Sequence, residues 1–362
     1  MKHWKETTEI LARVGQLGAA GRRAAVATVV RIEGSAYRRP GAKLLIEDDG
    51  TTSGGVSGGC LEADVREVGL SVMGDGTPRL LHYDTGSDDN KVWGLGLGCN
   101  GSVDIFVQPA GDATATEVTA RVRELLEGEV PFGVSTVVGG DSRVGSAVVF
   151  GLEGILAGST GDAGLDRELA RQAAHLFAGG ESSLHDVGAF RVFTEVQTPP
   201  PHLVVFGAGD DSIPLCAYAS DAGFRVTVVD HRPAYLSRER FPSAARVFLR
   251  RAEEGTDGLP LGPRAYAVVK THSFAQDREW VRRLLEAGVP YVGLLGPRAR
   301  TAKILGDVGG IGVGRVYGPV GLDIGAEGPE QVALSIVAEL LAVRASRGPL
   351  HLREREGAIH AT

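Results

Sequence analysis

The sequence predicts an α/β protein in which an N-terminal α+β domain with a mixed sheet precedes a C-terminal Rossmann-like domain with a doubly wound parallel sheet. Three observations predict this class. Short β-branched segments alternate with helical patterns between residues 202 and 295, which is typical of parallel sheets with crossover helices. Three consecutive prolines at 199–201 favour a stiff connector before that region. Valine-rich strands and helical patterns precede the prolines.

The N-terminal region contains segments of both kinds. Strands are expected at residues 24–32, 42–48 and 103–109. The spacing of apolar residues predicts helices over residues 4–17, 60–73, 117–126 and 165–177. Residues 133–150 hold two valine-rich runs separated by Gly-Gly-Asp, which predicts a hairpin. We expect these elements to form one domain over residues 1–197.

The C-terminal region repeats a strand and helix pattern. Five strands are expected at residues 202–206, 224–230, 245–249, 265–269 and 291–295. Helical patterns lie between several of them, so we expect a Rossmann-like domain over residues 198–345. The last residues, 346–362, have a weak apolar pattern and mixed charge, and we interpret them as a surface tail.

Length and composition exclude several classes of function. A chain of 362 residues is long enough for about two domains. Its formal net charge of -7 argues against nucleic acid as a partner, which needs a basic surface. No apolar stretch approaches the roughly 18 residues of a membrane span, although a peripheral membrane association stays open. The three cysteines are too few for a disulfide framework, so we expect a cytoplasmic protein with reduced thiols.

A glycine-rich loop leads into a predicted helix near Cys60. Glycine makes up 52 of the 362 residues, about 14% and twice the usual roughly 7%. Four glycines surround Ser57 in residues 54–59, and bare amides of this kind bind anions. The positive end of the helix would lower the pKa of Cys60. The loop therefore predicts a reactive-thiol site, and a buried cysteine at a tight helix start is the alternative.

A second loop, residues 94–101, has glycine at every other position before Cys99. Alternating glycine clears one face of an extended segment for a ligand or another backbone. Neither Cys60 nor Cys99 has a second cysteine or histidine at short spacing, so we expect no metal site. Arg38 and Arg39 would meet an anionic ligand if their turn folds beside Cys60, and otherwise form a plain basic turn. Cys216 lies in an apolar helix and is expected to be an inert core residue.

The C-terminal domain carries a dinucleotide-binding pattern. Gly207 would make the tight turn, Gly209 would admit a phosphate to the helix N-terminus, and Asp230 would accept from ribose hydroxyls. Ser212 occupies the third glycine position, and Asp210 and Asp211 place carboxylates where the helix dipole would attract a phosphate. A Rossmann scaffold whose ligand is not NAD is therefore an equal alternative.

Two further side chains follow strands at the same predicted edge of this sheet. His272 follows the fourth strand and Arg298 follows the fifth. Ligands of open α/β sheets bind at the carboxyl ends of the strands, so His272 could touch a ligand and Arg298 could clamp a phosphate or carboxylate. A structural histidine and a solvated arginine are the alternatives.

Taken together, these segments resemble the XdhC/CoxI family, the maturation factors of xanthine and carbon monoxide dehydrogenases. The similarity runs from about residue 10 to residue 345. The segments that carry it are residues 34–46, 54–62, 94–109, 204–215, 225–233, 269–273, 291–300 and 318–340. Asp210 departs from the family pattern, which has a histidine there.

The resemblance implies a protein that binds molybdenum cofactor transiently and protects it. It also implies that the protein supports sulfuration of the cofactor by a cysteine desulfurase and delivers it to a molybdenum hydroxylase. The thiols implied by the family pattern are Cys60 and Cys99. The residues expected at binding sites are Arg38, Arg39, Ser57, Gly58, Gly59, Cys60, Glu62, Gly96, Gly98, Cys99, Asn100, Gly207, Gly209, Asp211, Asp230, His272 and Arg298.

Two other classes of function compete with a maturation factor. An NAD(P)-dependent oxidoreductase would use the Rossmann domain with His272 as acid or base, but it has no need for the cysteines of the first domain. A thiol redox enzyme would use Cys60 with Cys99, which are not close in sequence. For any of the three classes we expect a homo-oligomer, most simply a dimer.

Overall fold

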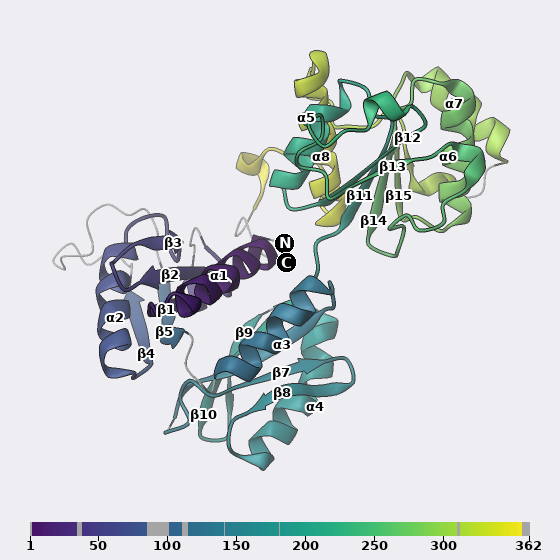
Figure 1. Cartoon of the computed structure of the whole chain (residues 1–362). Coiled ribbons are helices and arrows are strands. Elements are labelled where there is room, and N and C mark those ends of the chain that lie inside the picture. Colours follow the sequence, from purple (N-terminus) through teal and green to yellow (C-terminus); the bar gives the residue numbers. More distant parts are fainter. Residues whose placement is uncertain are drawn as a thin grey trace. The chain divides into compact units, whose positions relative to one another are not determined.

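The structure is a computed structural model, and it describes residues 2–34, 38–84, 101–110, 115–140, 142–180, 182–309 and 312–356. The chain divides into two compact units, Met1–Pro199 and Pro200–Thr362. Figure 1 shows the strands and helices of each unit. No helix of the described residues is both long and apolar enough to cross a membrane.

The first sheet of the N-terminal unit has the strand order β3-β2-β1-β5-β4. Its strands are β1 (Ala24–Gly34), β2 (Lys43–Glu47), β3 (Thr52–Gly54), β4 (Arg79–Asp84) and β5 (Gly101–Ala110). Helix α2 (Glu62–Asp75) packs on one face through Val65 and Val72, against Ala27 and Ile105. Alternate residues of a strand point to opposite faces, so Val26 and Thr28 point away from α2.

The second sheet has the order β8-β7-β6-β10-β9. Its strands are β6 (Phe132–Gly139), β7 (Ala147–Gly151), β8 (Gly154–Ser159), β9 (Ser183–Val187) and β10 (Phe190–Gln197). Helix α4 (Ala163–Gly179) packs on one face through Leu165 and Leu169. Trp4 of α1 (Lys2–Ala19) and Val122 of α3 (Ala115–Glu127) pack on the other. The two sheets meet where Val30 and Phe106 contact Val138 and Phe193.

The two sheets repeat one topology, a feature that the sequence patterns did not reveal. Each consists of a helix, three strands, a second helix and two strands, with the same spatial order of strands. Residues 26–30 of β1 read VATVV, and residues 134–138 of β6 read VSTVV. These five-residue segments occupy equivalent places, because β1 and β6 are the central strands of their sheets. The N-terminal unit is therefore an internal repeat.

The α+β class of the N-terminal unit is confirmed, but the prediction of a mixed sheet is wrong. Every described strand pair of both sheets is antiparallel. Helix α2 does connect strands that run in the same direction, β3 and β4, but these lie at opposite edges of the sheet. Helix α4 joins β8 to β9 in the same way. Crossover helices are thus present without parallel neighbours.

The predicted Rossmann-like domain is confirmed in the C-terminal unit. Its strands are β11 (His202–Phe206), β12 (Arg225–Asp230), β13 (Arg246–Leu249), β14 (Ala265–Val269), β15 (Tyr291–Leu294) and β16 (Val316–Tyr317). All pair in parallel, in the order β13-β12-β11-β14-β15-β16. This is the dinucleotide-fold order 3-2-1-4-5-6, with its switch point between β11 and β14.

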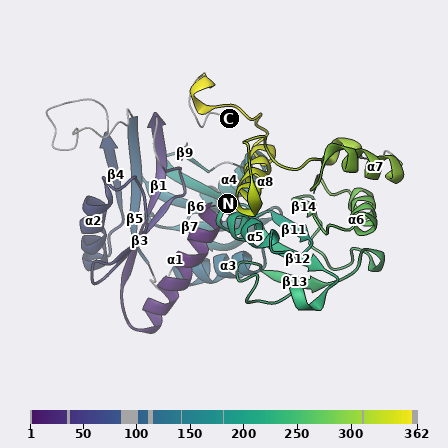
Figure 2. The same cartoon turned by 90° about the horizontal axis from the view of Figure 1, so that it is seen from above.

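Helices cover both faces of the parallel sheet. They are α5 (Ser212–Asp221), α6 (Phe274–Glu286), α7 (Arg298–Val308) and α8 (Gly328–Arg344). Figure 2 shows that α5 lies beside α8 and that α6 lies beside α7. Trp280 of α6 and Ile304 of α7 pack on Val204 and Phe206. Short 3₁₀ turns lie at Pro233–Tyr235, Ala252–Glu254, Val313–Arg315 and Leu352–Glu354.

Candidate functional site

The glycine-rich loop before α2 is closed by its own side chains. The Glu62 carboxylate accepts from the amides of Val56 (3.2 Å) and Ser57 (2.8 Å) and from the Ser57 hydroxyl. Ser57 Oγ accepts at 3.1 Å from three more amides, those of Gly59, Cys60 and Leu61. Burial acts to raise the pKa of Glu62, but these hydrogen bonds outweigh it and the pKa is lowered. The prediction of bare amides is therefore wrong for this loop.

Cys60 lies on the turn that Ser57 holds, and not at the helix start that the sequence predicted. Helix α2 begins at Glu62, with Leu61 as its N-cap residue. The Cys60 thiol is free and half-buried. It packs on the apolar cluster between α2 and the first sheet, together with Ile32 and Tyr83. A half-buried thiol on a fixed turn presents a sulfur atom next to apolar surface.

Arg38 lies beside this loop, as its proposed role requires. Arg38 Nε donates to the Gly55 carbonyl oxygen at 2.8 Å, and its Nη2 donates to Glu6 of α1. Arg39 is exposed, and its carbonyl oxygen accepts from the Ala42 amide at 3.0 Å. The guanidinium of Arg38 therefore joins α1 to the residue that starts the Cys60 loop.

The second predicted loop lies mostly outside the described residues, and with it Gly96, Gly98, Cys99 and Asn100. Strand β5 begins directly after these residues, at Gly101, which pairs with Gly34 at the end of β1. A Cβ atom at Gly101 would lie 1.9 Å from the Glu33 carbonyl oxygen. Glycine is therefore required where this segment joins the sheet.

In the C-terminal unit, the turn after β11 approaches β14 closely. Gly207 has φ +118°, and a Cβ atom there would lie 2.5 Å from the Lys270 carbonyl oxygen. Asp230 Oδ2 accepts from the Ala208 amide at 2.7 Å, and Arg232 donates to both carboxylate oxygens. Burial acts to raise the pKa of Asp230, but Arg232 and the amides lower it to about 2. Asp230, predicted to hold a ribose, thus fixes the turn itself.

Asp211 links the two strand ends that flank the switch point. Its carboxylate accepts from Lys270 Nζ at 3.0 Å and lies 3.1 Å from His272 Nε2. Lys270 Nζ also donates to the Asp211 carbonyl oxygen at 2.7 Å. Burial acts to raise the pKa of Asp211, but the charge of Lys270 outweighs it and the pKa is lowered. His272 has φ +61°, an unusual value for a residue with a side chain.

This cluster occupies the predicted phosphate position. A Cβ atom at Gly209 would lie 2.7 Å from Asp211 Oδ1, so the carboxylate stands over the second glycine of the turn. A dinucleotide places its pyrophosphate at this point. Sequence reasoning did not include Lys270, which is 3% exposed and whose pKa is lowered by burial. The sequence signal that could have indicated Lys270 was its position at the end of the fourth strand, two residues before His272.

The two remaining predictions in this unit have different outcomes. Arg298 is exposed at the start of α7. The arginine that reaches the strand ends is Arg300, whose Nη2 donates to buried Asp277 at 2.6 Å. Cys216 is fully buried in α5, as expected, and burial raises its pKa to about 12. Among the described residues, no group of three or more His, Cys, Asp or Glu side chains could hold a metal ion.

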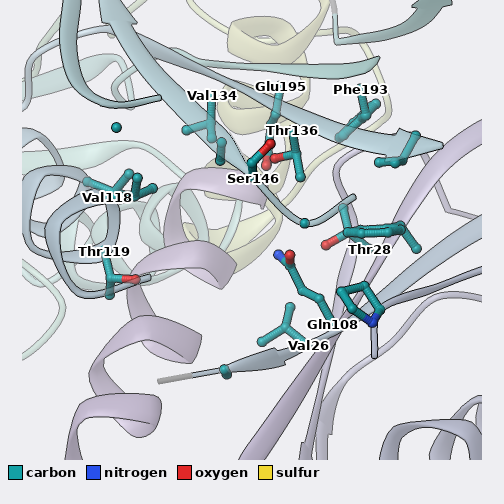
Figure 3. A pocket seen from close by; sticks show the side chains of 18 of the residues that line it. Val26, Thr28, Gln108, Val118, Thr119, Val134, Thr136, Ser146, Phe193 and Glu195 are labelled. Atoms are coloured by element: carbon teal, nitrogen blue, oxygen red, sulfur yellow. The ribbon is translucent and has the colours of Figure 1, made fainter. Parts of the chain in front are cut away.

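A cavity of about 820 Å³ lies between the two sheets of the N-terminal unit, and sequence reasoning did not predict it. Figure 3 shows side chains from both repeats around it, including Val26, Gln108, Val134 and Thr136. Lys43 and Glu195 form a buried ion pair at its side, with Nζ 2.6 Å from Oε2. The VATVV and VSTVV segments are the sequence signal that could have located it, because both line the cavity.

The comparisons with known proteins cover both units. The model of the XdhC and CoxI family matches residues 17–84, and that of the XdhC Rossmann domain matches residues 203–340. A Bacillus subtilis (strain 168) protein named as a probable xanthine dehydrogenase subunit is 36% identical over 322 residues, 89% of this chain and 93% of that protein.

Two further similarities concern a chaperone and a solved structure. The molybdenum cofactor insertion chaperone PaoD of Escherichia coli (strain K12) is 37% identical over 114 residues, 32% of this chain and 34% of that protein. A crystal structure described as a xanthine dehydrogenase from Bacillus halodurans has a TM-score of 0.78 at 29% identity. That similarity covers 94% of this chain and 96% of the solved chain.

Proposed function

Because this chain belongs to the XdhC and CoxI family, we propose that it is a maturation factor that carries molybdenum cofactor to a molybdenum hydroxylase of the xanthine dehydrogenase type. The relative named as a molybdenum cofactor insertion chaperone supports a cofactor cargo. The Bacillus subtilis relative, whose name refers to xanthine dehydrogenase, supports the class of client.

The single structural observation that carries the proposal is the setting of Cys60. Molybdenum in this cofactor has soft thiolate ligands, which suit a cysteine sulfur as a neighbour. Cys60 offers a half-buried thiol on a turn in which five amides, those of Val56, Ser57, Gly59, Cys60 and Leu61, donate to the side chains of Ser57 and Glu62. A rigid turn holds the sulfur in one place without a second ligand.

The finer steps extend the same proposal. The protein binds the cofactor transiently, protects it while a cysteine desulfurase supplies sulfur, and then passes it to the hydroxylase. Transfer of this kind takes place in the cytoplasm, where thiols stay reduced. We propose a homodimer as the carrier.

The Rossmann crevice argues against an NAD(P)-dependent oxidoreductase. Asp211 places a carboxylate over Gly209, and Asp230 is already bonded to Ala208 and Arg232. Both positions that a dinucleotide needs are thus taken by side chains of the protein. The His272 side chain contacts the Asp211 carboxylate, which is the group that obstructs the crevice.

The test is retention of the cofactor by the purified whole chain. The chain is mixed with molybdenum cofactor released from a hydroxylase, unbound cofactor is removed by gel filtration, and molybdenum and pterin are measured per chain. We expect nearly one molybdenum atom and one pterin per chain. We also expect the loaded protein to activate a cofactor-free hydroxylase. A parallel NADH titration should show no saturation at micromolar concentrations. Loss of both molybdenum and pterin on the column would refute the proposal.

A further inference from the structure

The cavity between the two sheets is built by the internal repeat. Val26 pairs with Gln108 and Thr28 with Phe106 in the first sheet, and Val134 pairs with Glu195 and Thr136 with Phe193 in the second. Positions of the same register in the two sheets therefore line the cavity, with the same residue type at three of the four and Gln108 opposed to Glu195 at the fourth. Apolar side chains of both sheets line this cavity, called the slot below, and α1 and α3 contribute further apolar side chains. Its volume of about 820 Å³ is within the usual range for small-molecule sites.

Besides Gln108 and Glu195, the two repeats differ at the positions of Lys43 and Ala147, and this second difference opens one side of the slot. Lys43 of β2 pairs with Thr28, and its equivalent, Ala147 of β7, pairs with Thr136. Lys43 reaches across to Glu195, with Nζ 2.7 Å from Oε1 and 2.6 Å from Oε2. In the other half of the repeat, Gln108 takes the place of Glu195 and Ala147 takes the place of Lys43. The methyl group of Ala147 cannot form a hydrogen bond with Gln108. One side is thus closed by an ion pair and the other is left open.

One polar group on the open side lacks a hydrogen-bond partner within the described part of the unit. Ser146 Oγ is buried and has no hydrogen-bond partner, although it lines the cavity next to Ala147. Figure 3 shows the Gln108 amide directed into the cavity. A buried hydroxyl without a partner is destabilising, so a bound molecule that supplies the missing hydrogen bond is favoured here.

We infer that this slot holds the pterin part of the proposed cargo, whose neutral pyrimidinone ring is planar and has an amide edge. The Gln108 side chain offers both a donor and an acceptor, which match the C=O and N–H of a pyrimidinone ring. Val26 and Val134 would contact the ring faces, and Phe193 would stack beside them. The charges of Lys43 and Glu195 neutralise each other, so an uncharged ring meets no unpaired charge.

A backbone hydrogen bond links the strand that carries Lys43 to the Cys60 loop, although Cys60 itself packs on the α2 side of the first sheet, the face opposite the slot. Lys43 lines the cavity with its side chain, and its carbonyl oxygen accepts from the amide of Gly55, the residue that starts the loop, at 2.8 Å. This inference rests on the proposed function only for the identity of the ring. The slot and its unpartnered Ser146 hydroxyl are properties of the chain itself.

The test uses pterin, a fluorescent ring without metal or phosphate, titrated into the whole chain. We expect saturable binding by the natural sequence and an affinity at least about tenfold lower for Gln108→Leu. Val134→Phe should abolish binding by filling the slot. Ser146→Ala, a change too small to prevent folding, should weaken binding by a few fold. Gln16→Leu makes the same chemical change on an exposed face of α1 and should bind like the natural sequence.

Molybdenum cofactor retention separates the two proposals. If the natural sequence retains cofactor and Gln108→Leu retains as much, the slot is wrong and the maturation function stands. If the natural sequence retains no cofactor, the function fails, and pterin binding that depends on Gln108 still supports the slot. Absence of saturable pterin binding by a chain that retains cofactor would overturn the inference.

Discussion

Cys60 and Cys216 are two free thiols with opposite surroundings. Cys60 is half-buried on a turn of the first sheet, whereas Cys216 is fully buried in α5 of the C-terminal unit. Burial raises the pKa of Cys216 to about 12, so this thiol stays protonated and unreactive at neutral pH. Of these two thiols, only Cys60 therefore fits the cofactor-handling role that we propose.

We predict that Cys60→Ser folds but retains less molybdenum cofactor. Serine keeps the volume and the turn but replaces a soft sulfur by a hard oxygen, which binds molybdenum more weakly. Cys216→Ala should lose stability, about 1 kcal/mol in urea unfolding, and retain cofactor fully. Molybdenum per chain after gel filtration measures both. Full retention by Cys60→Ser together with loss by Cys216→Ala would place the cofactor in the other unit.

Asp230 gives the C-terminal unit a dependence on acid. Its pKa of about 2 in the folded protein lies below the ordinary value of about 3.9. A lowered carboxyl pKa stabilises the fold above pH 4, and this contribution is lost as the pH falls towards 2. The side chain is 4% exposed, so solvent screens it little. A contribution of about 2 kcal/mol follows for neutral pH.

We therefore predict that Asp230→Asn lowers the stability of the C-terminal unit by about 2 kcal/mol at pH 7. The difference from the natural sequence should narrow between pH 4 and pH 2. Fluorescence of buried Trp280 during urea unfolding, in a background with Trp4 and Trp93 replaced by Phe, reports on this unit. Asp221→Asn, at the exposed end of α5, is the control. A difference that stays constant with pH would show that Asp230 acts through shape and not charge.

At the scale of elements, the turn between β11 and α5 decides what the Rossmann crevice can bind. Its glycines have the close approach that a dinucleotide fold requires, with Gly207 against β14. The difference lies in Asp211, which bonds Lys270 and lies beside His272 instead of leaving the phosphate position empty. A carboxylate held in this position acts as an internal substitute for a phosphate group.

We predict weak NAD binding by the natural sequence and tighter binding by Asp211→Asn. The amide keeps the shape and removes the negative charge beside the pyrophosphate, and a gain of about tenfold corresponds to about 1.4 kcal/mol. Asp210→Asn is the matched control, because the Asp210 carboxylate is exposed and pairs with Arg240 at 2.9 Å. Isothermal titration calorimetry measures all three chains. Submicromolar NAD or NADP binding by the natural sequence would contradict this account of the crevice.

Most elements could be predicted from sequence because their patterns are local. The strand at His202–Phe206 matched residue for residue, and α1 extends the predicted residues 4–17 by two residues at each end. Two-residue β16 and three-residue β3 are too short for any period to show. The mixed sheet was predicted from strand patterns, helical spacing and a hairpin signal, and these patterns do not reveal which strands become neighbours.

The candidate sites were predicted less completely, because their chemistry depends on which side chains meet. Glycine spacing located the Cys60 loop and the turn at Gly207. In the structure, the side chains of Glu62 and Ser57 accept hydrogen bonds from the amides of this loop. These hydrogen bonds depend on side-chain rotamers, which residue spacing does not determine. The ion pair between Lys43 and Glu195 joins residues 152 positions apart. A cavity between two sheets is therefore visible only after the fold is known.

For the molecule as a whole, the internal repeat explains why the N-terminal unit needs two sheets. In each repeat α2 or α4 covers one sheet face, and the opposite faces, against which α1 and α3 also pack, meet at Val30, Phe106, Val138 and Phe193. A single repeat would expose this apolar face to water. The cavity lies in the same layer, where the two faces do not fill the space between them.

Helix α8 suggests where two chains could associate. Leu334 and Leu341 are 51% and 38% exposed on this helix, and their separation of seven residues places them on one face. A self-complementary apolar strip is what a twofold interface requires. The expected homodimer can therefore be tested at defined positions.

We predict a dimer of the 37.9 kDa chain at micromolar concentration, measured by light scattering during gel filtration. Charge on an apolar strip opposes its burial against a second copy, so the double variant Leu334→Glu with Leu341→Glu should shift the mass to that of one chain. Leu152→Glu places the same charge at a residue that is 74% exposed in the N-terminal unit and should leave the dimer intact. A single-chain mass for the natural sequence would rule out the dimer, and a dimer that persists in the double variant would place its interface away from α8.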